Sequence, residues 1–162
     1  MKPPSNPITP AGMHAMKARY EHLFGTERPE IVEIISWAAG NGDRSENGDY
    51  LYGRKRLREI DREISYLSRR MKEARVIDPA QQVDRERVFF GAKVTLADEN
   101  DENAEFTLIG DDEQDASARR IGWSSPMARA LKGARVGDVR IVAVPAGSRE
   151  WEVMAIHYPP AS

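Results

Sequence analysis

Apolar residues recur at alternating steps of three and four through residues 57–74. The series consists of Leu57, Ile60, Ile64, Leu67, Met71 and Ala74. A heptad series this regular lines one side of an α-helix and requires a second helix to cover it. Residues 57–74 therefore predict one arm of a helical coiled coil.

The covering helix is predicted upstream, where Thr9 and Pro10 form an N-cap and first-turn pair. Apolar residues then follow at helical spacing: Met13, Met16, Tyr20, Leu23, Ile31, Ile34, Ile35 and Ala38. Pro29 should kink or interrupt this helix because proline has no N–H to donate. The short turn between the two patterns predicts an antiparallel, intramolecular hairpin over residues 9–78, and we expect a monomer. Residues 1–8 are Pro-rich and are expected to form a disordered extension.

The tip of this hairpin, residues 42–50, is acidic and rich in turn formers. It carries Asp43, Glu46 and Asp49 together with Gly42, Asn47 and Gly48. One interpretation is structural: Asp43 and Glu46 fit the N-cap and third helical position of a capping box, with Ser45 as a competing cap.

A calcium loop is a second interpretation of the tip, since four residues match EF-hand positions one, three, five and six. They are Asp43, Ser45, Asn47 and Gly48. The twelfth position would be Arg54, and a cation there repels the metal. The calcium interpretation is therefore disfavoured, whereas the capping box and a functional role for the acids both remain open.

A basic stripe is predicted on residues 54–75, which carry nine basic and four acidic residues. Its members are Lys55, Arg58, Arg62, Arg69 and Lys72, with Arg54, Arg56 and Arg70 widening it. Their spacing places them opposite the apolar seam. A solvated coiled-coil face normally alternates in sign, so this uniform charge favours contact with phosphates.

After Asp78 and Pro79 the pattern changes, and residues 79–87 are predicted to be a linker. Short β-branched and aromatic runs then predict strands at residues 88–90, 94–96, 106–109, 139–144 and 151–156. Residues 125–131 predict one helix with Ser125 as N-cap and Pro126 in the first turn, closed by Gly133. Residues 88–158 thus predict a small antiparallel sheet with one helix, and the chain is of the α+β class. The nine acids between Asp98 and Asp115 are expected in solvated hairpin loops and edges.

Composition excludes several kinds of site. The chain has no Cys, so disulfides and thiolate zinc sites are excluded. The 162 residues contain no apolar run long enough to span a membrane, and the first residues lack the apolar core of a signal peptide. We therefore expect a cytoplasmic protein with no membrane partner.

Four segments together resemble the bacterial Gre transcript-cleavage factors, specifically the GreB branch. They are residues 42–50 (GDRSENGDY), 55–62 (KRLREIDR), 88–92 (VFFGA) and 125–131 (SPMARAL). The resemblance runs from about Ile8 to Tyr158 in family order. It implies an N-terminal coiled-coil hairpin, a C-terminal FKBP-like domain and action on RNA polymerase.

The resemblance also implies a mechanism and assigns the residues. The hairpin would enter the secondary channel of the polymerase and stimulate its hydrolysis of backtracked RNA at the nascent 3′ end. Asp43 and Glu46 would help to hold a Mg²⁺ ion shared with the polymerase, with Ser45 and Asp49 in support. Lys55, Arg58, Arg62 and Arg69 would hold the RNA. Ser125, Pro126, Met127 and Arg129 would contact the polymerase. The chemistry would belong to the polymerase, so no nuclease activity is expected of the chain alone.

Two alternatives of other classes remain at this point. A channel-binding inhibitor could use the same hairpin, although the presence of both Asp43 and Glu46 disfavours it. An FKBP-like domain could also be a prolyl isomerase or an interaction module. The aromatic residues that an isomerase pocket would use are Phe89, Phe90, Phe106, Trp123 and Trp151, and aromatics of this kind are more often core.

Overall fold

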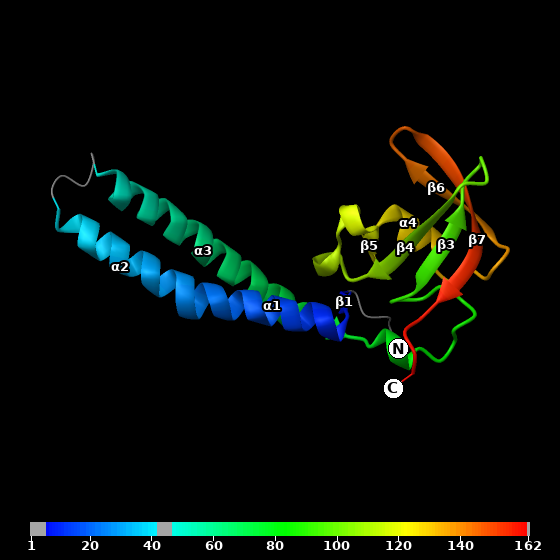
Figure 1. Cartoon of the computed structure of the whole chain (residues 1–162), viewed down its shortest axis with the longest axis horizontal. Helices are drawn as coiled ribbons and strands as arrows, with labels where there is room; N and C mark the ends of the chain where they lie inside the picture. The colour runs from blue at the N-terminus through cyan, green and yellow to red at the C-terminus, as the bar shows by residue number, and fades with distance from the viewer. Residues whose placement is uncertain (1–5, 42–46, 162) are drawn as a thin grey trace. The chain divides into compact units, whose positions relative to one another are not determined.

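The structure, a computed structural model, describes residues 6–41 and 47–161. The chain divides into two compact units, one formed by Met13–Glu73 and the other by Met1–Gly12 together with Ala74–Ser162. The first is a helical hairpin and the second is built on a curled sheet (Figure 1). This arrangement confirms the predicted α+β class. None of the helices in the described residues is long and apolar enough to cross a membrane.

Two arms form the hairpin. One consists of α1 (Pro10–His22), the π-helical turn η1 (Leu23–Glu27) and α2 (Arg28–Ala39), and the other is α3 (Gly48–Glu73). The predicted start is confirmed, because the Thr9 hydroxyl accepts a hydrogen bond of 3.0 Å from the N–H of Gly12. Pro29 lies in the first turn of α2, directly after the π-helical turn. The expected interruption thus takes the form of one widened π-helical turn. At this turn the helix tolerates the backbone hydrogen bond that proline cannot donate.

The apolar seam between the arms follows the predicted heptad with one change of phase. On the first arm Met16, Leu23, Ile31 and Ala38 are buried, at steps of seven, eight and seven. The step of eight spans η1, where a π-helical turn adds one residue and keeps the seam facing α3. Ile34, predicted in the seam, is instead 42% exposed.

On α3 the predicted seam residues Ile60 and Leu67 are buried, and the seam extends toward the tip through Gly53. A Cβ atom at Gly53 would lie 2.7 Å from Cγ1 of Ile35 on α2. Glycine therefore permits a close approach of the two helices at this level.

Between the described residues, three ion pairs connect the arms beside the seam. Arg19 lies 2.8 Å from Glu63, Arg28 lies 2.8 Å from Asp61, and Arg56 donates to Glu27 over 2.7 Å. The hydrogen bond from Arg19 lowers the pKa of the Glu63 carboxyl, although its partial burial acts in the opposite direction. These pairs fix the register of the hairpin more than they add to its stability, since exposed pairs contribute about 0–1 kcal/mol each.

The boundaries of the hairpin differ from those predicted. Helix α3 ends at Glu73 rather than near residue 78, and Arg75–Val76 form a short strand, β2. This strand pairs in parallel with β1 (Pro7–Ile8), so residues 6–8 are ordered and buried rather than part of a loose extension. Backbone pairing across the sequence explains both differences, because neither strand has a local signal.

The predicted linker is also held in place. Residues Pro79–Gln81 form the 3₁₀ turn η2, and the Asp78 side chain caps it by accepting from the N–H of Ala80 over 2.9 Å. The Arg85 guanidinium donates to the carbonyls of Ala80 and Pro159, both at 2.8 Å. Residues 79–87 therefore pack as part of the sheet-containing unit.

Among the described residues, five strands make the sheet. They are β3 (Lys93–Ala97), β4 (Asn103–Ile109), β5 (Arg120–Gly122), β6 (Val139–Val144) and β7 (Gly147–His157), in the order β5-β4-β3-β7-β6. Three neighbouring pairs are antiparallel, whereas β4 and β5 are parallel. The predicted antiparallel sheet is therefore mixed, because its edge strand β5 pairs in parallel. The connection between β4 and β5 contains the 3₁₀ turns η3 (Asp111–Glu113) and η4 (Ala116–Ala118) and returns the chain alongside Thr107.

The core of this unit lies between the sheet and α4 (Pro126–Leu131), whose buried residues are Ala128 and Leu131. The predicted N-cap is confirmed, since the Ser125 hydroxyl accepts from the N–H of Ala128 over 3.2 Å. Residues 88–90 do not form the predicted strand, although Val88 and Phe90 are buried. An isolated bridge between Arg87 and Arg135 precedes them.

Candidate functional site

The tip of the hairpin is described on both sides of the predicted acidic site. Helix α2 ends at Ala39 and α3 begins at Gly48. Asp43, Ser45 and Glu46, the residues predicted to hold the shared metal, lie outside the described residues. The structure therefore describes the helix ends on either side of this segment, at Ala39 and Gly48.

Asn47 joins the two described ends through its side chain. Its Nδ2 donates to the carbonyl oxygen of Ala38 at the end of α2 over 2.8 Å. Its Oδ1 accepts from the N–H of Tyr50 over 3.1 Å, which is the N-cap bond of α3. The capping-box interpretation of Asp43 and Glu46 therefore does not hold for α3, because this helix begins at Gly48, five residues after Asp43, and Asn47 caps it.

The same geometry bears on the calcium interpretation. An EF-hand loop would use the side-chain oxygen of Asn47 as a metal ligand. That oxygen instead accepts the Tyr50 N–H, and Arg54 is an exposed residue of α3. Among the described residues no group of three or more His, Cys, Asp or Glu could hold a metal ion.

Asp49 is the one predicted tip acid that the structure describes. It is exposed in the first turn of α3, where the helix dipole favours a negative charge. The supporting role expected of Asp49 at the tip stays a prediction.

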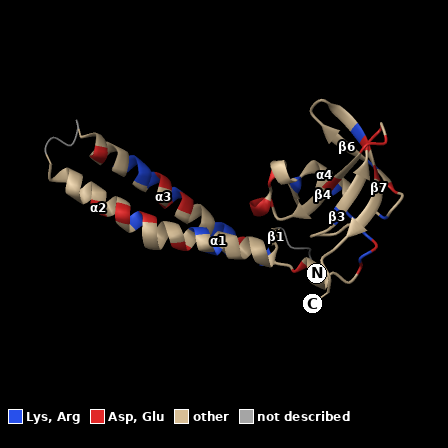
Figure 2. Cartoon of the chain, viewed as in Figure 1, with Lys and Arg blue, Asp and Glu red and all other residues tan. Residues whose placement is uncertain are grey.

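The basic stripe lies on the solvent side of α3. All five predicted members, Lys55, Arg58, Arg62, Arg69 and Lys72, are exposed. Lys55 and Arg58 form no ion pair with any described residue, and Arg62 donates only to the carbonyl of Arg58 over 3.4 Å. Figure 2 shows the basic positions along α3 in blue. These cations are available to bind a polyanion.

Arg56 and Arg70, predicted to widen the stripe, have structural partners instead. Arg56 bonds to Glu27 on the other arm and lies 3.3 Å from Glu59. Arg70 lies 3.7 Å from Glu73. Both are only partly exposed, so the stripe is narrower than the sequence predicts.

The predicted docking residues of α4 have unequal exposure. Pro126 and Arg129 are exposed, whereas Met127 packs against the core and the Ser125 hydroxyl is used as the N-cap. Ser124, just before the helix, donates from Oγ to Asp111 Oδ2 over 2.5 Å and from its N–H to Oδ1 over 3.0 Å. The start of α4 is thus held by the bonds of Ser124 to Asp111 and by the Ser125 cap. Pro126 and Arg129 form the exposed surface of the helix.

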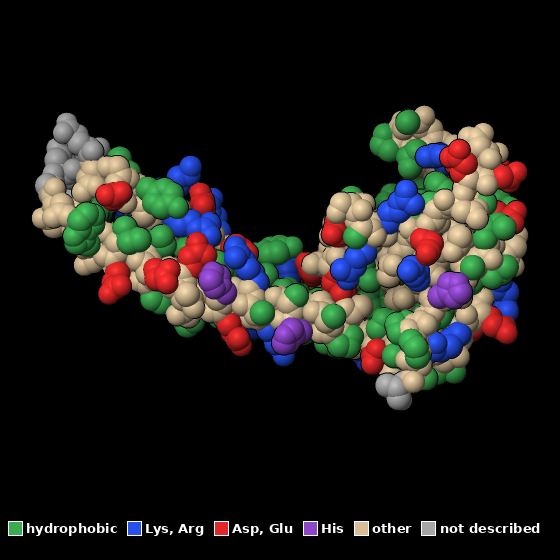
Figure 3. Space-filling view, in the orientation of Figure 1, with side chains coloured by type: hydrophobic (Ala, Val, Ile, Leu, Met, Phe, Trp, Pro, Cys, Tyr) green, Lys and Arg blue, Asp and Glu red, His purple; other side chains and the backbone are tan. Residues whose placement is uncertain are grey.

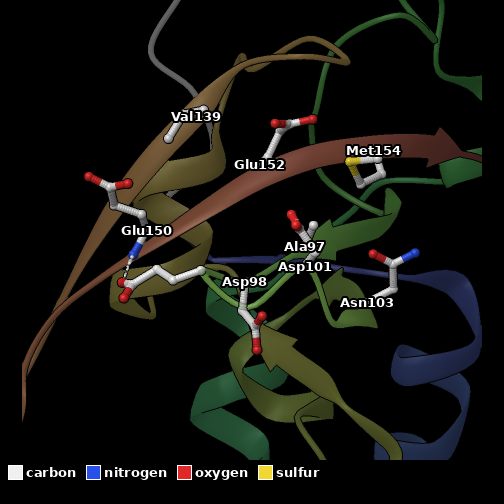
Figure 4. A pocket seen from close by; sticks show the side chains of 9 residues that line it. Ala97, Asp98, Asp101, Asn103, Val139, Glu150, Glu152 and Met154 are labelled. Atoms are coloured by element: carbon white, nitrogen blue, oxygen red, sulfur yellow. Dashed lines mark hydrogen bonds between the residues drawn. The ribbon is translucent and has the colours of Figure 1, made fainter.

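A separate hollow on the sheet is acidic. It has a volume of about 490 Å³ and is lined by Ala97, Asp98, Glu99, Asp101, Asn103, Val139, Glu150, Glu152 and Met154. Figure 4 shows Glu150 and Glu152 on β7 facing this hollow, with the N–H of Glu150 donating to Glu99 over 3.0 Å. Five carboxylates line this hollow and repel phosphates, so the hollow does not suit RNA.

One acid of the predicted solvated set was misplaced by sequence reasoning. The Glu113 side chain is only 3% exposed and accepts from the N–H groups of Thr9 and Gly110 at 3.0 and 2.9 Å. The Thr9 hydroxyl also donates to it. In the sequence, Thr9 is recognisable only as the N-cap of α1. An N-cap needs only the bond from Gly12, so nothing local indicates that Thr9 also donates to Glu113.

Comparison with known proteins identifies the family. Residues 6–76 match the family described as "Transcription elongation factor, N-terminal", and residues 82–158 match "Transcription elongation factor, GreA/GreB, C-term". The chain belongs to the GreA/GreB family of transcription elongation factors. Family membership confirms both the resemblance found in the sequence and the predicted role in transcription elongation.

Similar Gre-family proteins match along almost their whole length. Transcription elongation factor GreB of Neisseria meningitidis serogroup B is 48% identical over 153 residues, covering 94% of each chain. GreB of Pseudomonas aeruginosa is 42% identical over 154 residues, covering 95% of this chain and 91% of the other. A crystal structure of GreA factor homolog 1 (Gfh1) of Thermus thermophilus aligns with a TM-score of 0.43 at 24% identity, covering 94% and 98% of the two chains.

The aromatic residues of the Gre C-terminal unit pack in pairs within the core. Phe90 meets Trp123 edge to face at 5.7 Å, and Phe106 meets Trp151 edge to face at 5.9 Å. Phe90 and Trp151 are buried. These rings stabilise the fold rather than line a pocket for a prolyl peptide.

Proposed function

We propose that this chain binds RNA polymerase, inserts the tip of its hairpin into the secondary channel and stimulates the polymerase's own hydrolysis of backtracked RNA. Release of the 3′ fragment would restart an arrested complex. The observation that carries the proposal is the role of Asn47, which caps α3 and bonds to Ala38. Because Asn47 supplies the cap, α3 does not need the carboxylates of Asp43 and Glu46.

Asp43 and Glu46 would hold a Mg²⁺ ion jointly with the polymerase. The donor set fits, since Mg²⁺ takes oxygen ligands and commonly uses only one or two protein carboxylates while keeping several waters. Two acids are too few to hold the ion alone, so the chain by itself would neither retain Mg²⁺ nor cut RNA. The ion would stabilise negative charge and lower the pKa of a bound water. Ser45 and Asp49 would support the site.

The other surfaces divide the remaining tasks. Lys55, Arg58, Arg62 and Arg69 would hold the extruded RNA by its phosphates. Their exposure, with no ion pair to the described residues of the other arm, supports this role. Pro126 and Arg129 would contact the polymerase, with Ser125 and Met127 fixing the helix that presents them.

The test is transcript cleavage in stalled, backtracked polymerase complexes with Asp43→Asn and Glu46→Gln variants. Each variant keeps the shape of the side chain and removes its charge. We expect each to slow cleavage strongly while leaving affinity for the polymerase close to normal, and raised Mg²⁺ should partly rescue the single variants. Asp49→Asn should cost less.

The matched control is Glu33→Gln, which removes an exposed carboxylate from α2 outside the tip and should be silent. Wild-type cleavage rates in the Asp43→Asn, Glu46→Gln double variant would eliminate the metal role. Blocked RNA extension without any shortened RNA would instead identify the chain as a channel-binding inhibitor.

A further inference from the structure

Two exposed tyrosines share a face of α3 with three members of the basic stripe. We define the aromatic–basic line as Tyr52, Lys55, Glu59, Arg62, Tyr66 and Arg69, which follow one another at steps of three and four. Residues at these steps lie one above another on a helix. Figure 3 shows several basic side chains along the α3 edge of the hairpin.

Neither tyrosine belongs to the seam. Tyr52 is 63% exposed and Tyr66 is 47% exposed, whereas the seam residues Ile60 and Leu67 are buried. Both rings therefore present part of their apolar surface to solvent, outside the seam.

The charges along the line favour an anionic occupant. Lys55, Arg62 and Arg69 are exposed, and the one acid on the line, Glu59, lies 3.3 Å from Arg56. The Arg69 guanidinium lies 5.8 Å from the centre of the Tyr66 ring, so a cation and a π-face are combined at one point. Cations that follow a backbone, interspersed with exposed rings, are how proteins bind single-stranded nucleic acid without reading its sequence.

We propose that Tyr52 and Tyr66 are stacking platforms for unpaired bases of single-stranded RNA, while Lys55, Arg62 and Arg69 bind its phosphates. The two tyrosines are 14 residues apart, which is about 21 Å along the helix at 1.5 Å per residue. An extended strand lying on α3 would thus meet two platforms with cations between them. This inference deepens the proposed function, since it specifies how the extruded RNA would be held, and it rests on that function for its biological setting.

Binding of the full chain to free RNA tests the platforms without the polymerase. The probe is a fluorescently labelled single-stranded RNA, compared at low salt with a strand of the same length that lacks bases. We expect the wild-type protein to bind the normal strand at least about fivefold more tightly, which is the low end for stacking of one base. The Tyr52→Leu, Tyr66→Leu double variant should bind both strands alike, whereas Tyr52→Phe, Tyr66→Phe should keep the preference.

Phe24→Leu is the matched control, because it removes a ring that is 58% exposed but lies on η1, off the line. Its preference for the normal strand should equal that of the wild type. Equal wild-type affinity for the two strands would overturn the proposal, as would loss of the preference in the Phe variant, which would assign the contact to the hydroxyls. Far-UV circular dichroism of each variant checks that α3 is intact.

Cleavage in backtracked complexes separates this inference from the proposed function. Tyr66→Leu should raise the concentration of protein that gives half-maximal cleavage, and bases removed from the extruded RNA should have the same effect on the wild type. If the wild-type protein stimulates cleavage equally well when the extruded RNA lacks bases, the stacking platforms alone are refuted. A wild-type protein that prefers the normal strand in solution but stimulates no cleavage would refute the proposed function alone.

Discussion

The carboxylate of Glu113 accepts a hydrogen bond of 3.0 Å from the N–H of Thr9, although 104 residues separate the two in the sequence. The Thr9 hydroxyl donates to the same carboxylate and also accepts from the N–H of Gly12. Thr9 thus caps α1 and connects its first turn to the turn η3. A Cβ atom at Gly12 would overlap the end of the Glu113 side chain, so any larger residue there would have to displace the carboxylate from Thr9.

Removal of the Glu113 carboxylate should destabilise the sheet-containing unit. In Glu113→Ala the N–H groups of Thr9 and Gly110 lose their acceptor while partly buried, and we expect a loss of about 2–4 kcal/mol in the free energy of unfolding. Urea denaturation followed by tryptophan fluorescence measures it. Glu105→Ala is the control, since Glu105 makes only an exposed pair with Lys93 at 3.7 Å and should cost under about 1 kcal/mol. Equal losses in the two variants would contradict the structural role of Glu113.

Asn47 should stabilise the end of the hairpin through both of its bonds. Asn47→Ala removes the cap of α3 and the bond to Ala38, so we expect a lower melting temperature of the helical signal, equivalent to about 1–2 kcal/mol. Asn47→Asp keeps the acceptor for Tyr50 and should lose less. Asn41→Ala should be silent, because Asn41 bonds to Ala38 through its backbone N–H. A silent Asn47→Ala would show that the cap is dispensable.

The basic stripe should matter in proportion to the length of extruded RNA. Changing Lys55 and Arg58 to Ser removes two exposed cations without breaking an ion pair between described residues. We expect the variant to lose more cleavage activity on long backtracked RNA than on short backtracked RNA. Its cleavage activity should also depend less on salt concentration than that of the wild type. Arg28→Ser is the control, since Arg28 is paired with Asp61 on the other arm. An equal reduction for short and long RNA would make the stripe merely structural.

Pro126 should affect docking without affecting folding. The side chain is exposed and the cap of α4 comes from Ser125, so Pro126→Ala should change the free energy of unfolding by less than about 1 kcal/mol. We expect weaker binding to RNA polymerase in a direct competition assay. Val136→Ala, at another exposed apolar residue of the same unit, should bind normally. Wild-type affinity of the Pro126 variant would remove α4 from the docking surface.

Features that depend only on a few neighbouring residues were predictable from the sequence. The heptad of α3, the N-caps at Thr9 and Ser125, and the strand at residues 139–144 all follow from local spacing and side-chain chemistry. The exposure of the basic stripe follows for the same reason, because a seam on one side of a helix fixes what lies on the other.

The tertiary structure decided whatever depends on partners far apart in the sequence. Tyr50 and Ala38 select Asn47 as the residue that caps α3, although Asp43 and Ser45 fit the local pattern as well. The backbone of β4 gives β5 its parallel neighbour, and β1 orders β2. Glu113 looks like a solvated acid in the sequence and is buried because Thr9 and Gly110 bring three donors to it. Local propensity cannot specify such contacts, since a buried polar group is stable only where the rest of the fold supplies its partners.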